Sequence, residues 1–361
     1  MKITDITTYI KGSTCLVKVD SDEGVFGFGQ CSGMNNDATN IIIHKNIKPV
    51  LIGMNPFDIE KIEEKVMKKN YKFSGQLLAM AYSGVEIALW DLKGKYLNQP
   101  IFNLIGGCYR ESAEMYGSSM SRDLSIEEEC AKVEENIRKY GFKAIKIKVG
   151  PRLGNPSSVP DLEPDVEKVR CIREVIGPKC KLIVDGNSSY TYFQALEFYE
   201  RIKQYDLYIF EEPCPYYDLE AYARLSQKLP VPIDLGEQDW NLVTFRDFIK
   251  QGSVQICAAD VTKCGGFSNA KRIAVLCRAF GIAFSPHNTS RGLGMAANLQ
   301  IIASSPECSA YHEYNIEPKA EPGYLLNDFE IKDGFIKIPK KPGLGVDLDI
   351  ELIEKTMEAS R

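Results

Sequence analysis

The chain has 361 residues, of which 44% are apolar and 26% are charged, and its formal net charge is −5. This length and composition suit a globular protein built from a large domain and a smaller one. Because no basic stripe is present on which phosphates could release counterions, we expect no nucleic-acid partner. No apolar run approaches the roughly 18 residues that span a bilayer, so we expect no membrane partner either.

The cysteines and the first residues bear on the compartment. The eleven cysteines are scattered along the chain without a C-x-x-C pair, which indicates reduced thiols. The opening residues lack the long apolar segment and the small-residue cleavage site of a signal peptide. We therefore expect a cytoplasmic protein.

Residues 1–112 mix short strands with helices and are expected to form an α+β capping domain. Polar and apolar residues alternate in three early segments, which is typical of half-buried antiparallel strands. Later segments place apolar residues at helical spacing. The expected strands are 2–10, 14–20 and 25–30, and the expected helices are 37–51, 56–68 and 76–96.

From residue 113 the pattern changes to a regular alternation of strand and helix. Several expected strands are short apolar runs, which fits parallel strands covered on both faces. Ser125 begins one helix with a glutamate three residues later, the spacing of a capping box. The expected strands are 113–117, 144–149, 181–184, 208–210, 233–236, 254–259, 282–285 and 308–312, and the expected helices are 125–140, 165–176, 192–202, 219–229, 243–250, 268–280 and 293–303.

Eight strands are thus accompanied by only seven helices. The segment after the last strand, YNIEPKAEPGY, is rich in proline and glycine and does not have a helical pattern. We predict an α/β fold in which residues 113–325 form a modified TIM barrel, (β/α)7β, preceded by the capping domain of residues 1–112. Residues 326–361 are expected to return to the capping domain.

Ionisable residues recur at an almost constant interval where these strands end. The interval of 23 to 27 residues is the length of one strand, one helix and two short loops. Because the strands of a parallel barrel all end on the same face, the series predicts a ring around one pocket. Its members are Asp185, Glu211, Glu237, Asp260, His287 and Glu313.

Three successive members of the series are carboxylates, and they point to a metal. Asp185, Glu211 and Glu237 would repel one another if all were ionised, and a divalent cation would remove that repulsion. An all-oxygen ligand set favours Mg²⁺ first and Mn²⁺ second, and argues against zinc. The alternative is that each acid is a solvated strand end or a helix N-cap. Glu212 is expected to be exposed or to support a ligand, and Asn187 to orient a ligand or substrate or to be a plain turn residue.

Two further groups suit proton transfer. Lys146 and Lys148 are two apart in a strand and share a face, so each is expected to lower the pKa of the other. The alternative is one solvated lysine face. Asp260 and His287 end adjacent strands, and a carboxylate beside an imidazole orients it and raises its basicity. Glu313, if protonated, could donate a hydrogen bond to a developing oxyanion.

These motifs, in this order, resemble those of the enolase superfamily, and within it the mandelate racemase group. The resemblance covers essentially the whole chain, including a long helix that ends in PIFNLIGG. It rests on the Lys-x-Lys, Asp-x-Asn, Glu-Glu-Pro and Gly-Glu motifs, on an aspartate followed by Lys-x-Gly-Gly, and on the final His–Glu pair. Muconate-lactonising enzymes, dipeptide epimerases and succinylbenzoate synthases carry a lysine where this chain has Asp260.

The resemblance implies a role for each member of the ring. Sites of this superfamily pair a lysine or histidine base with Mg²⁺, which stabilises an enediolate. By that resemblance, Asp185, Glu211 and Glu237 bind Mg²⁺. Lys148 is one acid/base, assisted by Lys146, and His287 is the other, supported by Asp260. Glu313 hydrogen-bonds the substrate carboxylate.

In this family the capping-domain loops choose the substrate, here around residues 26–37 and 70–75. These loops are polar and include Gln30, Asn35, Asn36, Asp37, Tyr71, Lys72 and Ser74. A polar lining suits a polyhydroxy acid better than an aromatic one, and we take Tyr71 and Asn187 as substrate-binding candidates. The alternative is that they are ordinary exposed loop residues.

We therefore predict a Mg²⁺-dependent dehydratase of an acid sugar, either an aldonate or an aldarate. Lys148 or His287 would remove the proton α to the carboxylate, and the β-hydroxyl would leave with a proton from His287 to give a 2-keto-3-deoxy acid. A racemase or epimerase of a 2-hydroxy acid would use the same two bases, and a non-catalytic sugar-acid-binding protein would need neither. The expected partner is a small carboxylate substrate, and family habit suggests a homo-oligomer.

Overall fold

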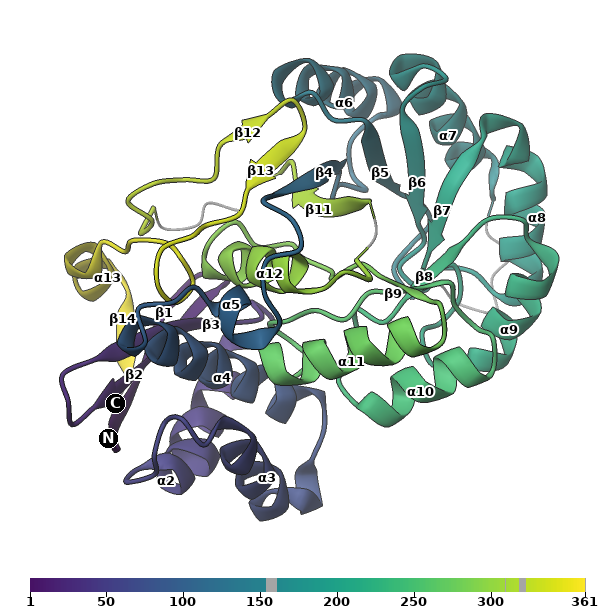
Figure 1. Cartoon of the computed structure of the whole chain (residues 1–361). Helices are drawn as coiled ribbons and strands as arrows, with labels where there is room; N and C mark the ends of the chain where they lie inside the picture. The colour runs from purple at the N-terminus through teal and green to yellow at the C-terminus, as the bar shows by residue number, and fades with distance from the viewer. Residues whose placement is uncertain (154–160, 309, 318–322, 361) are drawn as a thin grey trace.

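The computed structural model describes the whole chain except residues 154–160, 309, 318–322 and 361. Figure 1 shows two parts: a small sheet with its helices at the N-terminal end of the chain, and a large ring of strands surrounded by helices. One cluster of buried apolar side chains lies within the smaller part, and a larger one fills the barrel part and extends to Tyr9, Leu16, Phe28 and Ile87 of the smaller part. Within the described residues, no helix has the length and apolar character needed to cross a membrane.

The smaller part is a four-stranded antiparallel sheet packed on helices. The sheet order is β14-β1-β2-β3, so the last strand of the chain lies beside the first. Glycines let helix α4 lie directly on β3, since a Cβ on Gly29 would lie 2.1 Å from the carbonyl oxygen of Gly84. The elements are β1 (Ile3–Lys11), β2 (Thr14–Ser21), β3 (Phe26–Cys31), α1 (Asn36–Ile42), a π-helical turn (Ile43–Ile47), α2 (Lys48–Leu51), α3 (Ile59–Lys69), a 3-10 turn (Tyr71–Phe73), α4 (Gln76–Tyr96), α5 (Ile101–Ile105) and β14 (Glu358–Ser360).

The larger part is a parallel barrel. Its strands follow the order β4 to β10 around the ring, and β11 pairs with β4. A parallel bridge between Phe284 and Cys308 joins β10 to the segment before β11 and closes the ring. The strands are β4 (Ser112–Ser118), β5 (Ala144–Lys148), β6 (Lys181–Asp185), β7 (Leu207–Glu211), β8 (Ile233–Leu235), β9 (Ile256–Cys257), β10 (Ala283–Phe284) and β11 (Tyr311–Asn315).

In the described part of the barrel, seven helices alternate with the eight strands, as the sequence predicts. The capping box at Ser125 is present, because its side chain accepts from the Glu128 amide and Glu128 accepts from the Ser125 amide. Between β11 and β12 the described residues include no helix, and residues 318–322 lie outside them. The helices are α6 (Ile126–Tyr140), α7 (Glu163–Ile176), α8 (Tyr192–Ile202), α9 (Leu219–Lys228), α10 (Leu242–Lys250), α11 (Phe267–Ala279) and α12 (Leu293–Ser304).

The C-terminal segment crosses from the barrel to the small sheet. Strands β12 (Ile331–Lys332) and β13 (Phe335–Lys337) form a hairpin, and β13 pairs antiparallel with β4. Helix α13 (Ile350–Thr356) then leads to β14 on the edge of the small sheet. Figure 1 shows both chain ends at this sheet.

Two sequence expectations about elements are wrong. The helix expected over residues 37–51 is divided into α1, a π-helical turn and α2. The last barrel strand was expected to end before Glu313, but β11 continues to Asn315 and contains Glu313. Its sequence, YHEYN, has no apolar run, and its buried residues include the polar side chains of His312, Glu313 and Asn315.

Two buried carboxylates of α4 form what we call the cap–barrel joint. Glu86 lies at the N-terminus of α11 and accepts hydrogen bonds from Trp90 Nε1 (2.8 Å), the Phe267 amide (2.7 Å), and the amide and hydroxyl of Ser268 (2.9 and 2.6 Å). Gly266 leaves room for it, since a Cβ there would lie 2.1 Å from Glu86 Oε2. A carboxylate of the small part thus caps a barrel helix.

Asp91 is the second carboxylate of the joint. It accepts from the amides of Phe28 and Leu344, each at 2.8 Å, and pairs with Lys95. It therefore connects β3, α4 and the C-terminal segment through one side chain.

Candidate active site

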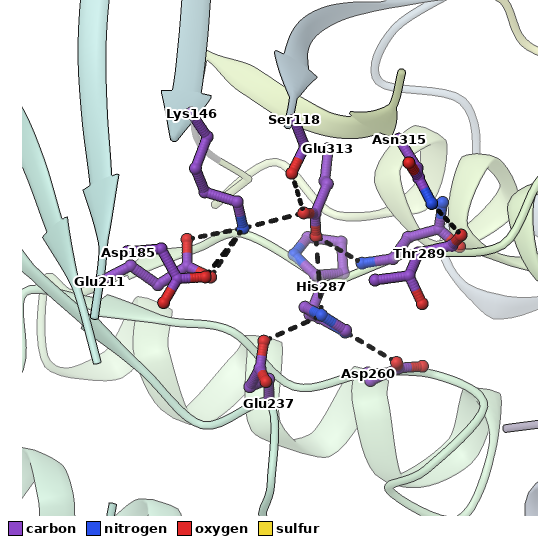
Figure 2. A network of polar contacts seen from close by, with 12 residues as sticks. Ser118, Lys146, Asp185, Glu211, Glu237, Asp260, His287, Thr289, Glu313 and Asn315 are labelled. Atoms are coloured by element: carbon purple, nitrogen blue, oxygen red, sulfur yellow. Dashed lines mark hydrogen bonds and ion pairs between the residues drawn. The ribbon is translucent and has the colours of Figure 1, made fainter. Parts of the chain in front are cut away.

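Five of the six predicted ring residues lie just where barrel strands end, in the region that we call the barrel mouth (Figure 2). Asp185 and Glu211 are the last residues of β6 and β7 and lie side by side in register. The other three follow β8, β9 and β10 by two or three residues: Glu237, Asp260 and His287. Glu313 faces them from within β11. All six side chains are buried.

The two lysines of β5 lie against these carboxylates. Lys146 Nζ contacts Glu211 Oε1 (2.7 Å), Glu313 Oε1 (2.8 Å) and Asp185 Oδ2 (3.8 Å). Lys148 Nζ hydrogen-bonds Asp185 Oδ2. Burial alone would lower the pKa of Lys146, but Glu211 and Glu313 raise it well above its ordinary value. The expectation that the two lysines lower each other's pKa is therefore wrong for Lys146.

His287 bridges two carboxylates with its two ring nitrogens. Its Nδ1 lies 2.8 Å from Asp260 Oδ2, and its Nε2 lies 2.9 Å from Glu237 Oε2 and 3.7 Å from Glu313 Oε2. Burial would lower the pKa of His287, but Glu237, Glu313 and Asp260 together raise it to about 10. Its position between carboxylates therefore favours the protonated, imidazolium form of the ring.

Glu313 accepts hydrogen bonds on both oxygens. Ser118 Oγ and Lys146 Nζ lie 2.7 and 2.8 Å from Oε1, and the Asn288 amide lies 3.2 Å from Oε2. Although burial would raise its pKa, Lys146 and His287 hold the pKa of Glu313 at about 2. It is thus an acceptor in this structure, and the expectation of a protonated Glu313 that donates a hydrogen bond is wrong.

The barrel mouth contains buried carboxyl oxygens that have no hydrogen-bond donor among the described residues. Glu212 is buried rather than exposed, and its Oε1 has no hydrogen-bond partner among the described residues. The same holds for Asp234 Oδ1, and burial raises the pKa of both groups well above their ordinary values. Burial, with Asp185 and Asp234 nearby, also raises the pKa of Glu211 despite Lys146. The region therefore favours an additional positive charge.

The proposed metal ligands have not converged on a common point. Among the described residues, no group of three or more histidine, cysteine, aspartate or glutamate side chains is positioned as it stands to hold a metal. Instead, each of the three carboxylates is paired with a side chain of the protein: Asp185 with Lys148, Glu211 with Lys146 and Glu237 with His287. Glu237 Oε2 is within ion-pair distance of His287 but receives no well-aligned hydrogen bond from the described residues. An all-oxygen set of buried carboxylates fits a hard divalent cation.

The two substrate-binding candidates lie in different surroundings. Asn187 is in the barrel mouth, where its amide nitrogen atoms donate to Asp185. Tyr71 is 68% exposed and is not brought into the network of Figure 2. Two of the polar loop residues have structural contacts: Gln30 bonds Ser290 and the Gly294 amide, and Asn36 bonds the Gly12 carbonyl.

Three residues of the barrel mouth were missed in the sequence. Ser118 ends β4 and reaches Glu313, Asp234 lies opposite Glu211, and Arg122 follows β4 and contacts Asn187. Ser118 and Arg122 could have been found by extending the strand-end series back to β4. At the end of β4 the chain has polar residues and no acid. Asp234 gave a weaker signal, since it lies inside the short strand β8 and not at the strand end, where Glu237 follows.

Comparison with known proteins identifies related sequences along the chain. Residues 2–106 match the family model of the mandelate racemase / muconate lactonizing enzyme N-terminal domain, and residues 128–352 match that of the enolase C-terminal domain-like family. D-xylonate dehydratase from Haloferax volcanii is 31% identical, with 99% of this chain and 89% of the relative covered. Arabinonate dehydratase from Saccharolobus solfataricus is also 31% identical, with 91% and 86% covered.

Solved structures share the whole fold. The crystal structure of the 3,6-anhydro-D-galactonate cycloisomerase from Zobellia galactanivorans matches with a TM-score of 0.88 and 28% identity, covering 99% of this chain and 100% of that one. The capping sheet and the modified barrel are therefore the fold predicted from the sequence.

Proposed function

This chain belongs to the mandelate racemase / muconate lactonizing enzyme family of the enolase superfamily, and from that premise we propose that it is a hydro-lyase that dehydrates an acid sugar. One observation carries the proposal: Lys148, the His287–Asp260 pair and three carboxylates face one another in the barrel mouth. Relatives that share about a third of its sequence are named as dehydratases of xylonate and arabinonate.

We propose that Asp185, Glu211 and Glu237 hold Mg²⁺, with Mn²⁺ as a substitute. The fit rests on the oxygen-only donor set and on Glu237 Oε2, a buried oxygen whose neighbour at ion-pair distance is His287 and which receives no well-aligned hydrogen bond from the described residues. When bound, the ion would neutralise the charge that develops on the substrate carboxylate as the α-proton leaves. Lys146 lies against Glu211 and Glu313 and would keep this dense group of acids from repelling one another.

The residues on either side would move the protons. Lys148 and His287 come from β5 and the loop after β10, which are separated by β4 and β11 on one side of the ring and by β6 to β9 on the other. One of them takes the α-proton, and the C–H electron pair forms the C=C bond of an enol. His287, oriented by Asp260, donates a proton to the β-hydroxyl, which leaves as water with the C–O electron pair. The enol then becomes a 2-keto-3-deoxy acid.

Isomerisation of a similar acid is the second candidate. The same two groups could exchange the α-proton between faces without loss of water, and one structural relative is named as a cycloisomerase. The catalytic groups are common to both reactions, so the distinction depends on the substrate.

A substrate screen tests the proposal. Mono- and diacid sugars are incubated with the protein and Mg²⁺ in D₂O, and 2-keto acid formation and α-deuterium incorporation are followed together. We expect keto acid from at least one sugar acid and none with a His287→Asn variant. Deuterium exchange without keto acid would replace dehydration by isomerisation, and the absence of both across the panel would contradict an enzyme of this class.

A further inference from the structure

Arg122 connects three neighbouring strand ends at the barrel mouth. It follows β4, its Nε donates to the Gly150 carbonyl after β5 (2.8 Å), and its Nη2 donates to Asn187 Oδ1 after β6 (2.9 Å). The Gly150 amide is itself fixed by both carboxylate oxygens of Asp165, at 3.0 and 3.1 Å. The guanidinium thus lies on an anchored carbonyl and reaches toward the site.

The chemistry of its neighbours fixes the orientation of the Asn187 amide. Arginine can only donate and an ionised carboxylate can only accept, so Asn187 must present Oδ1 to Arg122 and Nδ2 to Asp185. Nδ2 lies 3.2 Å from Asp185 Oδ2, and the Asn187 backbone amide lies 2.7 Å from Asp185 Oδ1. Both oxygens of the aspartate are therefore held by one residue.

The backbone at this turn is held in an uncommon conformation. Asn187 and Ser188 both have left-handed backbones, with φ of 42° and 66°. Asparagine tolerates this region better than most residues, but two consecutive non-glycine residues there require support from their surroundings. The contact with Arg122 supplies such support at Asn187, whose side chain would otherwise be free to turn away from Asp185.

Arg122 also has a donor to spare. Its Nη1 is buried and has no hydrogen-bond partner among the described residues. A surface arginine that served only to join loops would leave that group in water. Burying an unpaired donor costs free energy, so the burial of Nη1 beside the site indicates that the protein fixes the position of the guanidinium at that cost.

We infer that Arg122 is a positioning residue: it orients Asn187, and through Asn187 it sets the Asp185 carboxylate in the geometry that binds the metal. The inference rests on the proposed function, in which Asp185 is a metal ligand. Groups that orient metal ligands typically change metal affinity about 10- to 100-fold when they are removed. Loss of Arg122 should therefore weaken Mg²⁺ binding by a factor in that range.

The test measures Mg²⁺ binding without substrate or turnover. Wild-type protein is freed of metal with EDTA, dialysed and titrated with Mg²⁺ in a calorimeter, and the same is done for Arg122→Met. Methionine retains the length and removes every donor. Thermal unfolding of each metal-free protein shows whether it is folded. If Arg122→Met does not fold, Arg122→Lys replaces it, because an ammonium lacks the planar fork that spans Gly150 and Asn187.

A double-mutant cycle separates this mechanism from a general loss of structure. Asn187→Gly removes the amide while keeping a residue that accepts positive φ. If Arg122 acts through Asn187, the double variant should bind Mg²⁺ no more weakly than the worse single variant. Additive losses would mean that Arg122 acts by another route and would overturn the inference.

Arg173 provides a matched control at the other end of the barrel. Its guanidinium also joins loops through backbone carbonyls, those of Tyr205, Gly177, Cys180 and Asp206. Arg173→Met should lower the melting temperature without changing the Mg²⁺ dissociation constant. Equal Mg²⁺ affinity in wild type and Arg122→Met would overturn this inference alone, whereas a wild-type protein that binds no Mg²⁺ would overturn the proposed function with it.

Discussion

Buried carboxyl groups occur in two regions of this molecule, and their oxygens are partnered differently. At the cap–barrel joint, four donors serve Glu86, and two backbone amides and a lysine serve Asp91. In the barrel mouth, one oxygen each of Glu212, Asp234 and Glu237 lacks a hydrogen-bond partner among the residues described. The buried carboxylates of the cap–barrel joint are thus supplied with donors, whereas those of the barrel mouth are only partly supplied.

The pKa values follow from that difference. Burial raises the pKa of Glu86, but its donors limit the rise to about 7. Burial raises the pKa of Asp234 and of Glu212 well above their ordinary values, and neighbouring acids add to the rise. Buried acids with few hydrogen-bond partners destabilise the folded protein, and such residues are typical of active sites, where they serve function.

The largest effect should come from the proton-transfer groups of the mouth. Lys148→Ala and His287→Asn each remove one group, and we expect kcat/KM for keto-acid formation to fall at least ~10²–10⁴-fold. Lys143→Ala is the control, because this lysine lies just before the same strand in an exposed pair with Glu114. Normal turnover in both test variants would show that the mouth does not transfer protons.

Removing a joint carboxylate should affect stability instead. Glu86→Ala leaves the buried amides of Phe267 and Ser268 and the hydroxyl of Ser268 without an acceptor. At about 1–3 kcal/mol for each unsatisfied group, we expect the free energy of unfolding to fall by about 3 kcal/mol or more. Urea unfolding in EDTA measures this. A loss under about 1 kcal/mol, or a changed Mg²⁺ affinity in the folded variant, would remove the contrast between the two regions.

Removing a carboxyl group from the barrel mouth should increase the stability of the metal-free protein. Asp234→Asn keeps the shape of the side chain and removes a carboxyl whose Oδ1 has no partner among the described residues. Since a raised pKa means that ionisation opposes folding above pH 4, we expect the metal-free variant to have a higher melting temperature than wild type at pH 8. Thermal unfolding in EDTA tests this, and a lower melting temperature would contradict it.

The joint should also give a pH dependence of stability. The folded pKa of Glu86 is about 7, above its ordinary 4.5. The stability from this raised pKa is fully present below about pH 4.5 and is lost as pH rises through 7. Relative to Glu86→Gln, which cannot titrate, wild type should lose about 2 kcal/mol between pH 5 and pH 8. A difference between the two proteins that stays constant with pH would contradict the assignment.

The sequence predicted the barrel and most of the ring because strand–helix units have a fixed length. Asp185, Glu211, Glu237, Asp260 and His287 follow at that interval, so the strand ends could be located without coordinates. The fold follows from the same regularity, and the proline- and glycine-rich segment after the last strand contains no helix in the part that the structure describes.

What the sequence could not give depends on contacts between distant segments. The pKa of Lys146 is raised by Glu211 and Glu313 from other strands, whereas the sequence showed only its neighbour Lys148. Arg122 lies in a loop whose path is set by three strand ends, and Glu86 caps a helix some 180 residues further along the chain. No pattern of neighbouring residues in the sequence indicates any of these contacts.

The central claim is that Asp185, Glu211 and Glu237 share one hard cation. Anomalous diffraction from crystals soaked in Mn²⁺ tests it most directly. We predict a single strong peak within coordination distance of all three carboxylates, with Lys148 Nζ moved away from Asp185 and His287 away from Glu237. Crystals with no peak there, or with the ion bound only elsewhere, would contradict the account.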